Sequence, residues 1–413
     1  MHSTTSSPID SSPHAPHALI VGAGIAGLAA AWWLTHIGWS IRVLERAHHL
    51  RDGGHMMGIS GPGLGTIRRM GLVDALRAAA YPDMGTHTYR DRRGRDLLSV
   101  DYRKLLKEMD WITLRRTELV RILREAVGER ARIDFGITVE SIAEAIGDDP
   151  LTATLTDGST CTADLLIAAD GVHSSLRTRT IATDAECLRP LGYRYAAYDL
   201  PAHWDLAESF LSYAEPGLQS EYYHLQNDRI AALHVWRSSA HGMVPAPERR
   251  PLLAQVTARS HPVVQNGLAA VEPGAEVVID DLALVELPAW HKGRVLLLGD
   301  AAHSLSLISG QGAGMALASA SVLAEELERH AGASHPPTAQ HLATALAAHD
   351  RRLRPTVERL QQRSRKIAPA FVPATPVTFF LRNLALRALP QQLMRRIFIS
   401  GLKSEAEAMA ALQ

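Results

Sequence analysis

Hydrophobic and polar positions alternate along the chain in two different periods, which is typical of an α/β protein. Ala18 to Val21 is a short apolar run, residues 28–37 are helical in composition, and Ser40 to Leu44 is a second apolar run. Short apolar runs predict buried strands, and a strand, a helix and a strand in this order predict a βαβ unit over residues 17–46.

Later stretches predict further strands, hairpins and helices. Residues 86–104 predict a hairpin around Arg93-Gly94, and residues 111–127 read as a strand followed by an amphipathic helix. Short alternating runs over 132–169 predict strands, the last of which ends in Asp170-Gly171. An apolar run that ends in an acid and a glycine recurs at Val295 to Asp300, and there a glycine-rich turn and a helix of small residues follow.

Residues 188–280 hold most of the tyrosines and read as a separate sheet. Residues 219–226 and 229–237 predict a hairpin across Asn227-Asp228. If that turn has two residues, Glu221 opposes His234, and a one-residue slip would exchange the two faces. With this register, one face of the hairpin carries Glu221, Tyr223, His234 and Trp236, and the other carries Tyr222, His224, Gln226 and Arg237.

Glycines and prolines predict the breaks between elements. Gly58 to Gly65 contains Pro62 and is predicted to be a loop. Beyond Leu327 the chain predicts helices separated at its prolines, Pro355 and Pro369 among them. Residues 379–399 mix apolar residues with arginines, which favours a C-terminal helix that joins two domains; a membrane-surface helix is the alternative.

The composition excludes several classes of protein. The chain has 413 residues, and its 43 Lys and Arg balance its 43 Asp and Glu, so no net charge favours nucleic acid. Its 2 cysteines cannot form a disulfide framework, and its 20 histidines show no metal-binding spacing, so we expect no metal. Residues 1–17 lack the apolar core of a signal peptide, and no apolar run is long enough to span a bilayer. We therefore expect a cytoplasmic protein with a disordered lead-in.

The segment after the first strand is a dinucleotide-binding motif. Gly22-Ala23-Gly24-Ile25-Ala26-Gly27 is GxGxxG, and Glu45 ends the next strand 23 residues after Gly22. Gly22 permits the tight turn, Gly24 lets the backbone approach a pyrophosphate, and Gly27 lets the helix pack closely on the strand. A terminal acid such as Glu45 accepts hydrogen bonds from a ribose hydroxyl. The alternative is an ordinary glycine turn with a solvated Glu45.

Three separated segments together resemble one family. They are GAGIAGLAAAWWL…VLER, AADGVHSSLR and GRVLLLGDAAH…SGQGAGMALASA. They look like the GxGxxG, DG and GD motifs of the single-component (class A) flavoprotein hydroxylases, the p-hydroxybenzoate hydroxylase-like family, and are similar to its branch with the tetracycline-inactivating monooxygenases. The resemblance implies an α/β fold with a Rossmann-like FAD-binding domain of the glutathione-reductase type, an inserted, mainly antiparallel β substrate domain and a C-terminal helical segment. The expected lead-in comprises residues 1–17, and the expected FAD-binding domain comprises 18–80, 105–187 and 281–330. The expected substrate domain comprises 81–104 and 188–280, and the C-terminal helices comprise 331–413.

The resemblance also implies roles for single residues. The ADP end of FAD would be held by Gly22, Gly24 and Gly27, with Glu45 at the ribose and Arg46 near the adenosine. It further implies that the flavin and its ribityl chain meet Arg116, Asp170, Asp300, Gly310, Gly312, Ala313 and Gly314. The family often has a proline seven residues after the GD aspartate, and here Leu307 occupies that position. This departure bears on how oxygen transfer is positioned, not on FAD binding.

The resemblance implies an NAD(P)H-dependent FAD monooxygenase, with NADPH or NADH as co-substrate. O2 would react with the reduced flavin to form a flavin C4a-hydroperoxide, and this group would hydroxylate an aromatic or polycyclic small molecule. We expect a monomer or homodimer without nucleic-acid partners. His234, His224 and Tyr223 are the candidates for a base that acts on a substrate hydroxyl. A reductase or other flavoenzyme on the same fold, or a non-catalytic flavin-binding protein, is the alternative.

Overall fold

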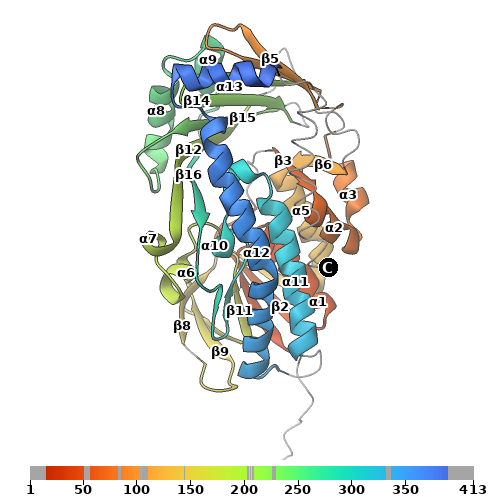
Figure 1. Ribbon diagram of the computed structural model, residues 1–413. Coiled ribbons are helices and arrows are strands. Elements are labelled where there is room, and N and C mark those ends of the chain that lie inside the picture. Colours follow the sequence, from red (N-terminus) through yellow and green to blue (C-terminus); the bar gives the residue numbers. More distant parts are fainter. Residues whose placement is uncertain are drawn as a thin grey trace, which may run out of the picture.

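The computed structural model describes residues 15–50, 56–81, 85–102, 104, 110–143, 145–201, 204, 206, 209–225, 229–331 and 336–388. Most of the expected lead-in lies outside these residues. Within them, the strands form sheets of six, seven, three and two strands. Figure 1 shows the six-stranded sheet with its helices in the lower half of the molecule and most of the seven-stranded sheet in the upper half.

The six-stranded sheet has the order β17-β18-β11-β1-β2-β7, and all its strands are parallel except β17. The parallel strands therefore end at one edge, where open α/β sheets bind their ligands. Their bounds are β1 (His17–Val21), β2 (Ser40–Glu45), β7 (Ala131–Phe135), β11 (Leu165–Ala168), β17 (His291–Lys292) and β18 (Val295–Leu297).

Both faces of this sheet are buried, which explains its uninterrupted apolar runs. Ala18 and Ile20 of β1 pack with the first core cluster, to which the helices α1 (Ile25–His36), α5 (Arg116–Val127) and α11 (Gly312–Ala331) contribute. Leu19 and Val21 point to the other face, which is covered by an antiparallel meander. The meander consists of β8 (Val139–Ala143), β9 (Leu151–Leu155) and β10 (Thr160–Ala163).

The segment Gly58 to Gly65 is not a loop, which corrects our expectation. Its first half belongs to β3 (Met56–Ser60), which pairs with β6 (Trp111–Arg115), and its second half opens α2 (Gly61–Arg69). Pro62 lies in the first turn of α2, where no hydrogen bond needs its missing N–H. A short helix, α3 (Val73–Ala78), follows.

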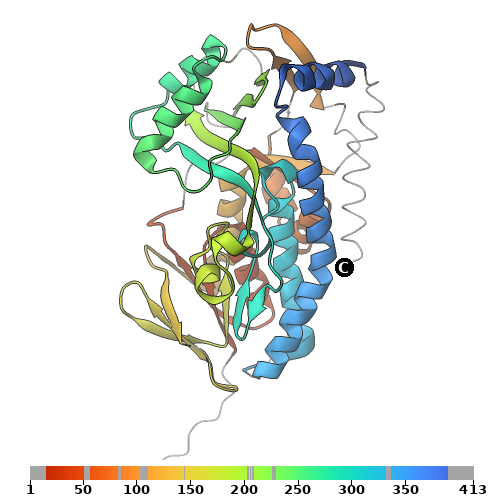
Figure 2. The same ribbon diagram turned by 60° about the vertical axis from the view of Figure 1, so that its left-hand side comes forward.

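The seven-stranded sheet has the order β16-β12-β15-β14-β13-β4-β5. One of its faces packs under α8 (Ala246–Thr257) and α9 (Pro262–Ala269), which Figure 2 shows in green at the upper left. Its other face packs against Leu307 and Ile308 and against the end of α12 (Ala339–Phe371). The strands are β4 (Thr86–Arg90), β5 (Asp96–Asp101), β12 (Leu188–Leu200), β13 (Phe210–Glu215), β14 (Leu218–His224), β15 (Ile230–Arg237) and β16 (Val278–Val285).

The register of the β14–β15 hairpin differs by one residue from the two-residue-turn prediction. Glu221 pairs with Leu233, and Ser220 pairs with His234. The N–H of Leu225 bonds to the carbonyl of Arg229, so three residues, not two, separate the last paired positions. Because side chains alternate along a strand, this slip puts Glu221 and His234 on opposite faces. The predicted turn residues Asn227 and Asp228 lie outside the described residues.

Helix α12 continues through Pro355 and Pro369, which we expected to be breaks. Each proline costs about 3 kcal/mol inside a helix, and apolar packing outweighs this here. The buried face of α12 includes Leu346 and Leu353. Figure 1 shows α12 running beside α11 toward the seven-stranded sheet. The remaining helices are α6 (Ser175–Thr180), α7 (Asp184–Cys187), α10 (Asp300–His303), α13 (Pro376–Ala388) and the short 3-10 turns η1 (Gly128–Arg130) and η2 (Leu307–Ser309).

Helix α13 lies against the seven-stranded sheet. The guanidinium of Arg387 donates to the carbonyls of Leu97 and Asp96 on β5, at 2.5 and 2.8 Å. The rest of the C-terminal segment expected to be helical, residues 389–399, lies outside the described residues. Among the helices that the structure describes, none has the length and apolar character needed to cross a membrane. Taken together, the described sheets and helices confirm the predicted fold class.

Candidate functional site

Two of the three glycines of the first motif are required by packing. Gly22 has a φ of 108°, and a Cβ added to it would lie 2.4 Å from the carbonyl oxygen of Ala169. A Cβ on Gly27 would lie 1.9 Å from the carbonyl oxygen of Gly22. Gly24 differs, because the nearest atom to its Cβ would be a guanidinium nitrogen of Arg116 at 3.9 Å. The space beside Gly24 is therefore open, as close approach of a ligand to the backbone requires.

Glu45 lies beside this loop, at the carboxyl end of β2. Its two carboxylate oxygens accept hydrogen bonds from the backbone N–H groups of Ala23 and Ala47, both at 2.9 Å. The carboxylate is thus fixed next to the N-terminus of α1, where a ribose would meet it. Arg46 is exposed at the same end of the strand.

Asp300 follows β18 through Gly299, whose φ is 64°. Its side chain is exposed, yet enough protein surrounds it that desolvation raises the pKa of its carboxyl, while the nearby charge of Arg116 lowers it. A Cβ on Gly312 would lie 3.9 Å from Oδ1 of Asp300. Asp300, Arg116 and the start of α11 therefore lie close to one another.

The loop before α11 has an unusual backbone. Ser306 is the only residue other than glycine with a positive φ, 66°, among those that the structure describes, and Gly310 also has a φ of 66°. The carbonyl of Leu307 accepts a hydrogen bond from the N–H of Gly310 at 3.1 Å. Leu307 thus completes a 3-10 turn in the position where the family often has proline. The N–H groups of the first turn of α11 remain available to a ligand.

Gly314 brings α11 close to α2. A Cβ on Gly63 of α2 would lie 2.5 Å from the Cα of Gly314, so position 63 needs glycine, whereas a Cβ on Gly314 would make ordinary contacts at 3.6 Å. Ala313, between Gly312 and Gly314, is partly buried against the first core cluster. Helix α2 therefore packs directly against the start of α11, next to the glycine-rich turn.

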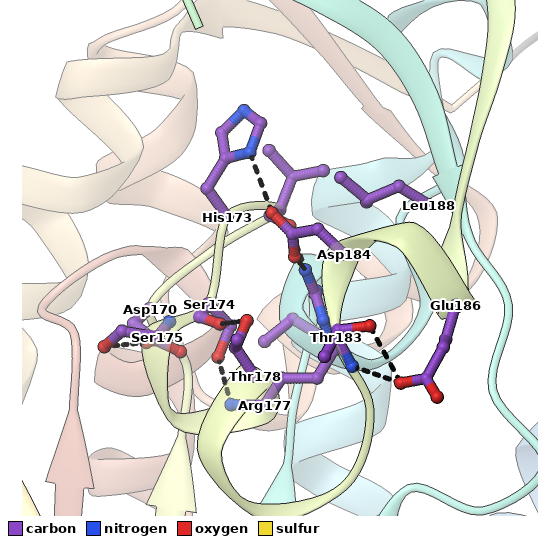
Figure 3. A network of polar contacts seen from close by, with 12 residues as sticks. Asp170, His173, Ser174, Ser175, Arg177, Thr178, Thr183, Asp184, Glu186 and Leu188 are labelled. Carbon is purple, nitrogen blue, oxygen red and sulfur yellow. Dashed lines mark hydrogen bonds and ion pairs between the residues drawn. The ribbon is translucent and has the colours of Figure 1, made fainter. Parts of the chain in front are cut away.

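A polar network surrounds Asp170, at the end of β11 (Figure 3). Oδ2 of Asp170 accepts hydrogen bonds from the N–H groups of Ser175 and Leu176, at 2.9 and 3.4 Å. Oδ1 is buried and has no hydrogen-bond partner among the described residues. The fully buried Arg177 donates to the carbonyl of Ala301 at 3.0 Å and pairs with Asp184 at 2.5 Å. Arg177 thereby ties this loop to α10, the helix that starts at Asp300.

His173 in the same loop reaches the seven-stranded sheet. Its Nε2 lies 2.9 Å from Oδ1 of Asp280 on β16, and this hydrogen bond raises the pKa of the imidazole. Both Arg177 and His173 lie in the segment AADGVHSSLR, but their roles are not predictable from the sequence, because nothing near them in the chain indicates a partner on another element.

The structure does not bring the three candidate bases together. Tyr223 is buried on the face that looks toward β3, and its hydroxyl accepts a hydrogen bond from the N–H of Met56 at 2.7 Å. His234 is buried on the opposite face, between the hydroxyls of Tyr198 and Ser220, each at 2.8 Å. His224 is exposed at the end of β14. Their catalytic roles stay predictions, and the placement favours Tyr223.

Glu221 is a further acid on the same face as Tyr223. Desolvation raises the pKa of its carboxyl to about 7, although Gln219 donates a hydrogen bond to Oε1 at 2.6 Å. The sequence pattern places Glu221 on a face of the hairpin but indicates no role for it. Its burial depends on the register of the hairpin, which the sequence leaves open.

The residues at the carboxyl edge of the six-stranded sheet fit FAD. The open backbone at Gly24 suits a pyrophosphate, and the accessible carboxylate of Asp300 suits a polyhydroxylated chain. The unpartnered Oδ1 of Asp170 offers a further acceptor. Among the described residues, no group of His, Cys, Asp or Glu could hold a metal ion.

Comparisons with known proteins agree with this geometry. Residues 16–338 match the model of the FAD binding domain family. The FAD-dependent monooxygenase asL4 of Sarocladium schorii is 30% identical over 371 residues, which cover 83% of this chain and 84% of the relative. The tetracycline destructase Tet(55) superimposes with a TM-score of 0.78 at 24% identity, covering 96% and 98% of the two chains. Klebsiella pneumoniae HpxO, solved with FAD and uric acid, gives 0.75 at 24% identity, covering 96% and 97%. The chain therefore belongs to the FAD binding domain family and is an FAD-dependent monooxygenase of class A.

Proposed function

We propose that this monooxygenase uses NADPH or NADH and O2 to hydroxylate an aromatic or polycyclic small molecule. The observation that carries the proposal is the exposed carboxylate of Asp300 beside the start of α11, followed in the chain by Leu307 and Ile308, which pack with Tyr193 and Tyr195 of the seven-stranded sheet. FAD, when bound, supplies the redox chemistry between the nicotinamide, O2 and the substrate. The chain would supply binding, orientation and exclusion of water.

The proposed roles follow the geometry of the site. Gly22, Gly24 and Gly27 would receive the pyrophosphate, and Glu45 and Arg46 the adenosine. Further contacts to the ribityl chain and flavin ring would come from Arg116, Asp170, Asp300, Gly310, Gly312, Ala313 and Gly314. The N–H groups at the start of α11 are suited to stabilise negative charge on a reduced ring.

The substrate would lie beside Leu307 and Ile308, along the face of the seven-stranded sheet that these residues pack against. Leu233 and Val235 share a cluster with these two residues, which supports an apolar, water-poor wall. Tyr223 is fixed by Met56, and because its oxygen accepts that bond, its own proton stays available to a substrate oxygen.

We further propose a cytoplasmic monomer or homodimer. Cys161 and Cys187 are both free, which suits a reducing compartment.

The first test is a spectrum and an oxygen-transfer assay. The purified protein is expected to show the visible absorption of bound FAD and to oxidise NADPH or NADH faster in the presence of an accepted aromatic compound. Product formed under isotopically labelled O2 is expected to carry the label. Stimulated NAD(P)H oxidation without labelled product would instead indicate a reductase, and protein that takes up no FAD would contradict the whole proposal.

A second test concerns the proposed contact of Asp300 with the ribityl chain. Asp300→Ala removes a carboxylate acceptor, and a hydrogen bond to a charged group contributes about 1.5–3 kcal/mol, so FAD affinity is expected to fall by about tenfold or more. The measurement is titration of the FAD-depleted protein by flavin fluorescence. Asp149→Ala, in an exposed turn, is the control and should bind FAD as the wild type does. Unchanged affinity in Asp300→Ala would exclude this contact.

A further inference from the structure

Glu221 lies on the face of the seven-stranded sheet that packs against Leu307 and Ile308. On β14 it pairs with Leu233 of β15 and with Ser212 of β13, so its side chain points to the same side as theirs. Leu233 packs in one cluster with Leu307 and Ile308, the residues just before Gly310. The carboxyl therefore lies on the proposed substrate side of the sheet, away from α8 and α9.

The surroundings of this carboxyl are polar but hold no matching cation. Gln219 donates to Oε1, and the hydroxyl-bearing rings of Tyr89, Tyr102 and Tyr223 are close enough for the Glu221 charge to raise their pKa values. Arg382 acts on the pKa of Tyr89 and is not among the causes that act on Glu221. Among the described residues, no Lys or Arg forms an ion pair with Glu221.

The carboxyl of Glu221 is partly shielded from water and has no positively charged side chain beside it within the described part of the chain. Glu221 is only partly exposed, and desolvation raises the pKa of its carboxyl to about 7. A positively charged group placed beside it would stabilise the ionised form, because opposite charges interact more strongly where water is scarce. A neutral donor would contribute one hydrogen bond, and an anion would be repelled.

We propose that Glu221, held by Gln219, selects aromatic substrates that carry a protonated amine and pairs with that ammonium group. The inference rests on the proposed function, since it concerns the substrate of that same site. Glu221 is here a specificity-determining residue, and the oxygen-transfer step needs no proton from it.

The test compares three phenols that share a ring and differ in the charge of the side chain. Tyramine carries an ammonium, para-ethylphenol is neutral, and para-hydroxyphenylpropionate is an anion. Their dissociation constants are measured on the FAD-loaded enzyme through the perturbation of the flavin spectrum. The wild type is expected to bind tyramine about tenfold more tightly than para-ethylphenol and the anion most weakly.

Glu221→Gln keeps the shape and the bond to Gln219 but removes the charge. Its preference for tyramine over para-ethylphenol is expected to fall by about tenfold, to near equality. Glu248→Gln on α8 changes the same charge on the other side of the sheet and should keep the wild-type preference. In the wild type the preference should also increase from about pH 6 to about pH 8 as Glu221 ionises, and it should stay constant in Glu221→Gln. A merely structural role would not produce this pH dependence.

Two results overturn the inference. One is a wild-type enzyme that binds tyramine no more tightly than para-ethylphenol, or whose flavin spectrum does not respond to tyramine at all. The other is a Glu221→Gln enzyme with wild-type FAD content and melting temperature that keeps the preference. Failure of the proposed function can be distinguished from failure of this inference. It would appear as a protein without FAD or as a product without the oxygen label, regardless of which phenol binds more tightly.

Discussion

Gly27→Ala is expected to lower the free energy of unfolding by about 3 kcal/mol and to abolish the retention of FAD through purification. The new Cβ would lie 1.9 Å from the carbonyl oxygen of Gly22, and this obstacle is backbone, which no rotamer change removes. Either α1 moves away from β1 or the loop opens, and both disturb the proposed pyrophosphate contact. Urea denaturation of the FAD-depleted protein measures the first effect, and the absorbance ratio of flavin to protein measures the second.

Gly24→Ala separates packing from cofactor contact. Its Cβ would meet only Arg116, at 3.9 Å, so the stability of the FAD-depleted protein should change by less than about 1 kcal/mol. FAD affinity should nevertheless fall by about tenfold or more, because the methyl group occupies the side from which a pyrophosphate approaches. The steric account is contradicted if the Gly27 variant is as stable as the wild type, or if both variants lose the same stability.

The free energy of unfolding is expected to fall steeply below about pH 6.5, because four buried histidines stay neutral in the fold at pH values where the unfolded chain protonates them. Desolvation lowers the pKa to about 3 in His87, His234 and His349, and to about 4 in His303. The unfolded chain takes up these protons near its ordinary histidine pKa, so acid favours unfolding until the folded values are reached. Glu221, whose pKa is raised, offsets one proton, so these five groups together contribute about three protons and about 4 kcal/mol per pH unit between about pH 5.5 and about pH 4.5.

Equilibrium urea denaturation at a series of pH values measures this slope. His349→Gln should reduce it by about one proton, or about 1.4 kcal/mol per pH unit. His341→Gln on the same helix replaces an exposed histidine and should leave the slope as it is. A wild type whose stability is constant between about pH 6 and about pH 4.5 would show that these histidines are not held neutral.

The cofactor half of the molecule was predictable from the sequence because its signals are local. A strand, GxGxxG, a helix and Glu45 lie within 29 residues, 17–45, and the structure has each of them where the pattern predicts. Asp300 likewise follows its strand directly. The roles of these residues toward FAD, like the domain boundaries, stay predictions.

The seven-stranded sheet was less predictable because its geometry depends on one turn. A loop one residue longer than expected moves His234 under α8 and α9 and leaves Glu221 facing Leu307. No feature within the strands distinguishes these registers, since both faces of the hairpin carry aromatic and polar residues. Pro355 shows the complementary case, in which tertiary packing of α12 overrides a strong local signal.

The contact between Gly63 and Gly314 leaves α2 and the start of α11 no room to move independently. α2 follows directly from β3, and the backbone of Met56 in β3 holds the hydroxyl of Tyr223 in the seven-stranded sheet. A chain of direct contacts thus runs from the glycine-rich turn to the seven-stranded sheet. When FAD orders the glycine-rich turn, the contacts also order the region around Tyr223, and the reverse holds for substrate. The binding of FAD and of substrate should therefore be thermodynamically coupled, so that each raises the affinity for the other by the same factor.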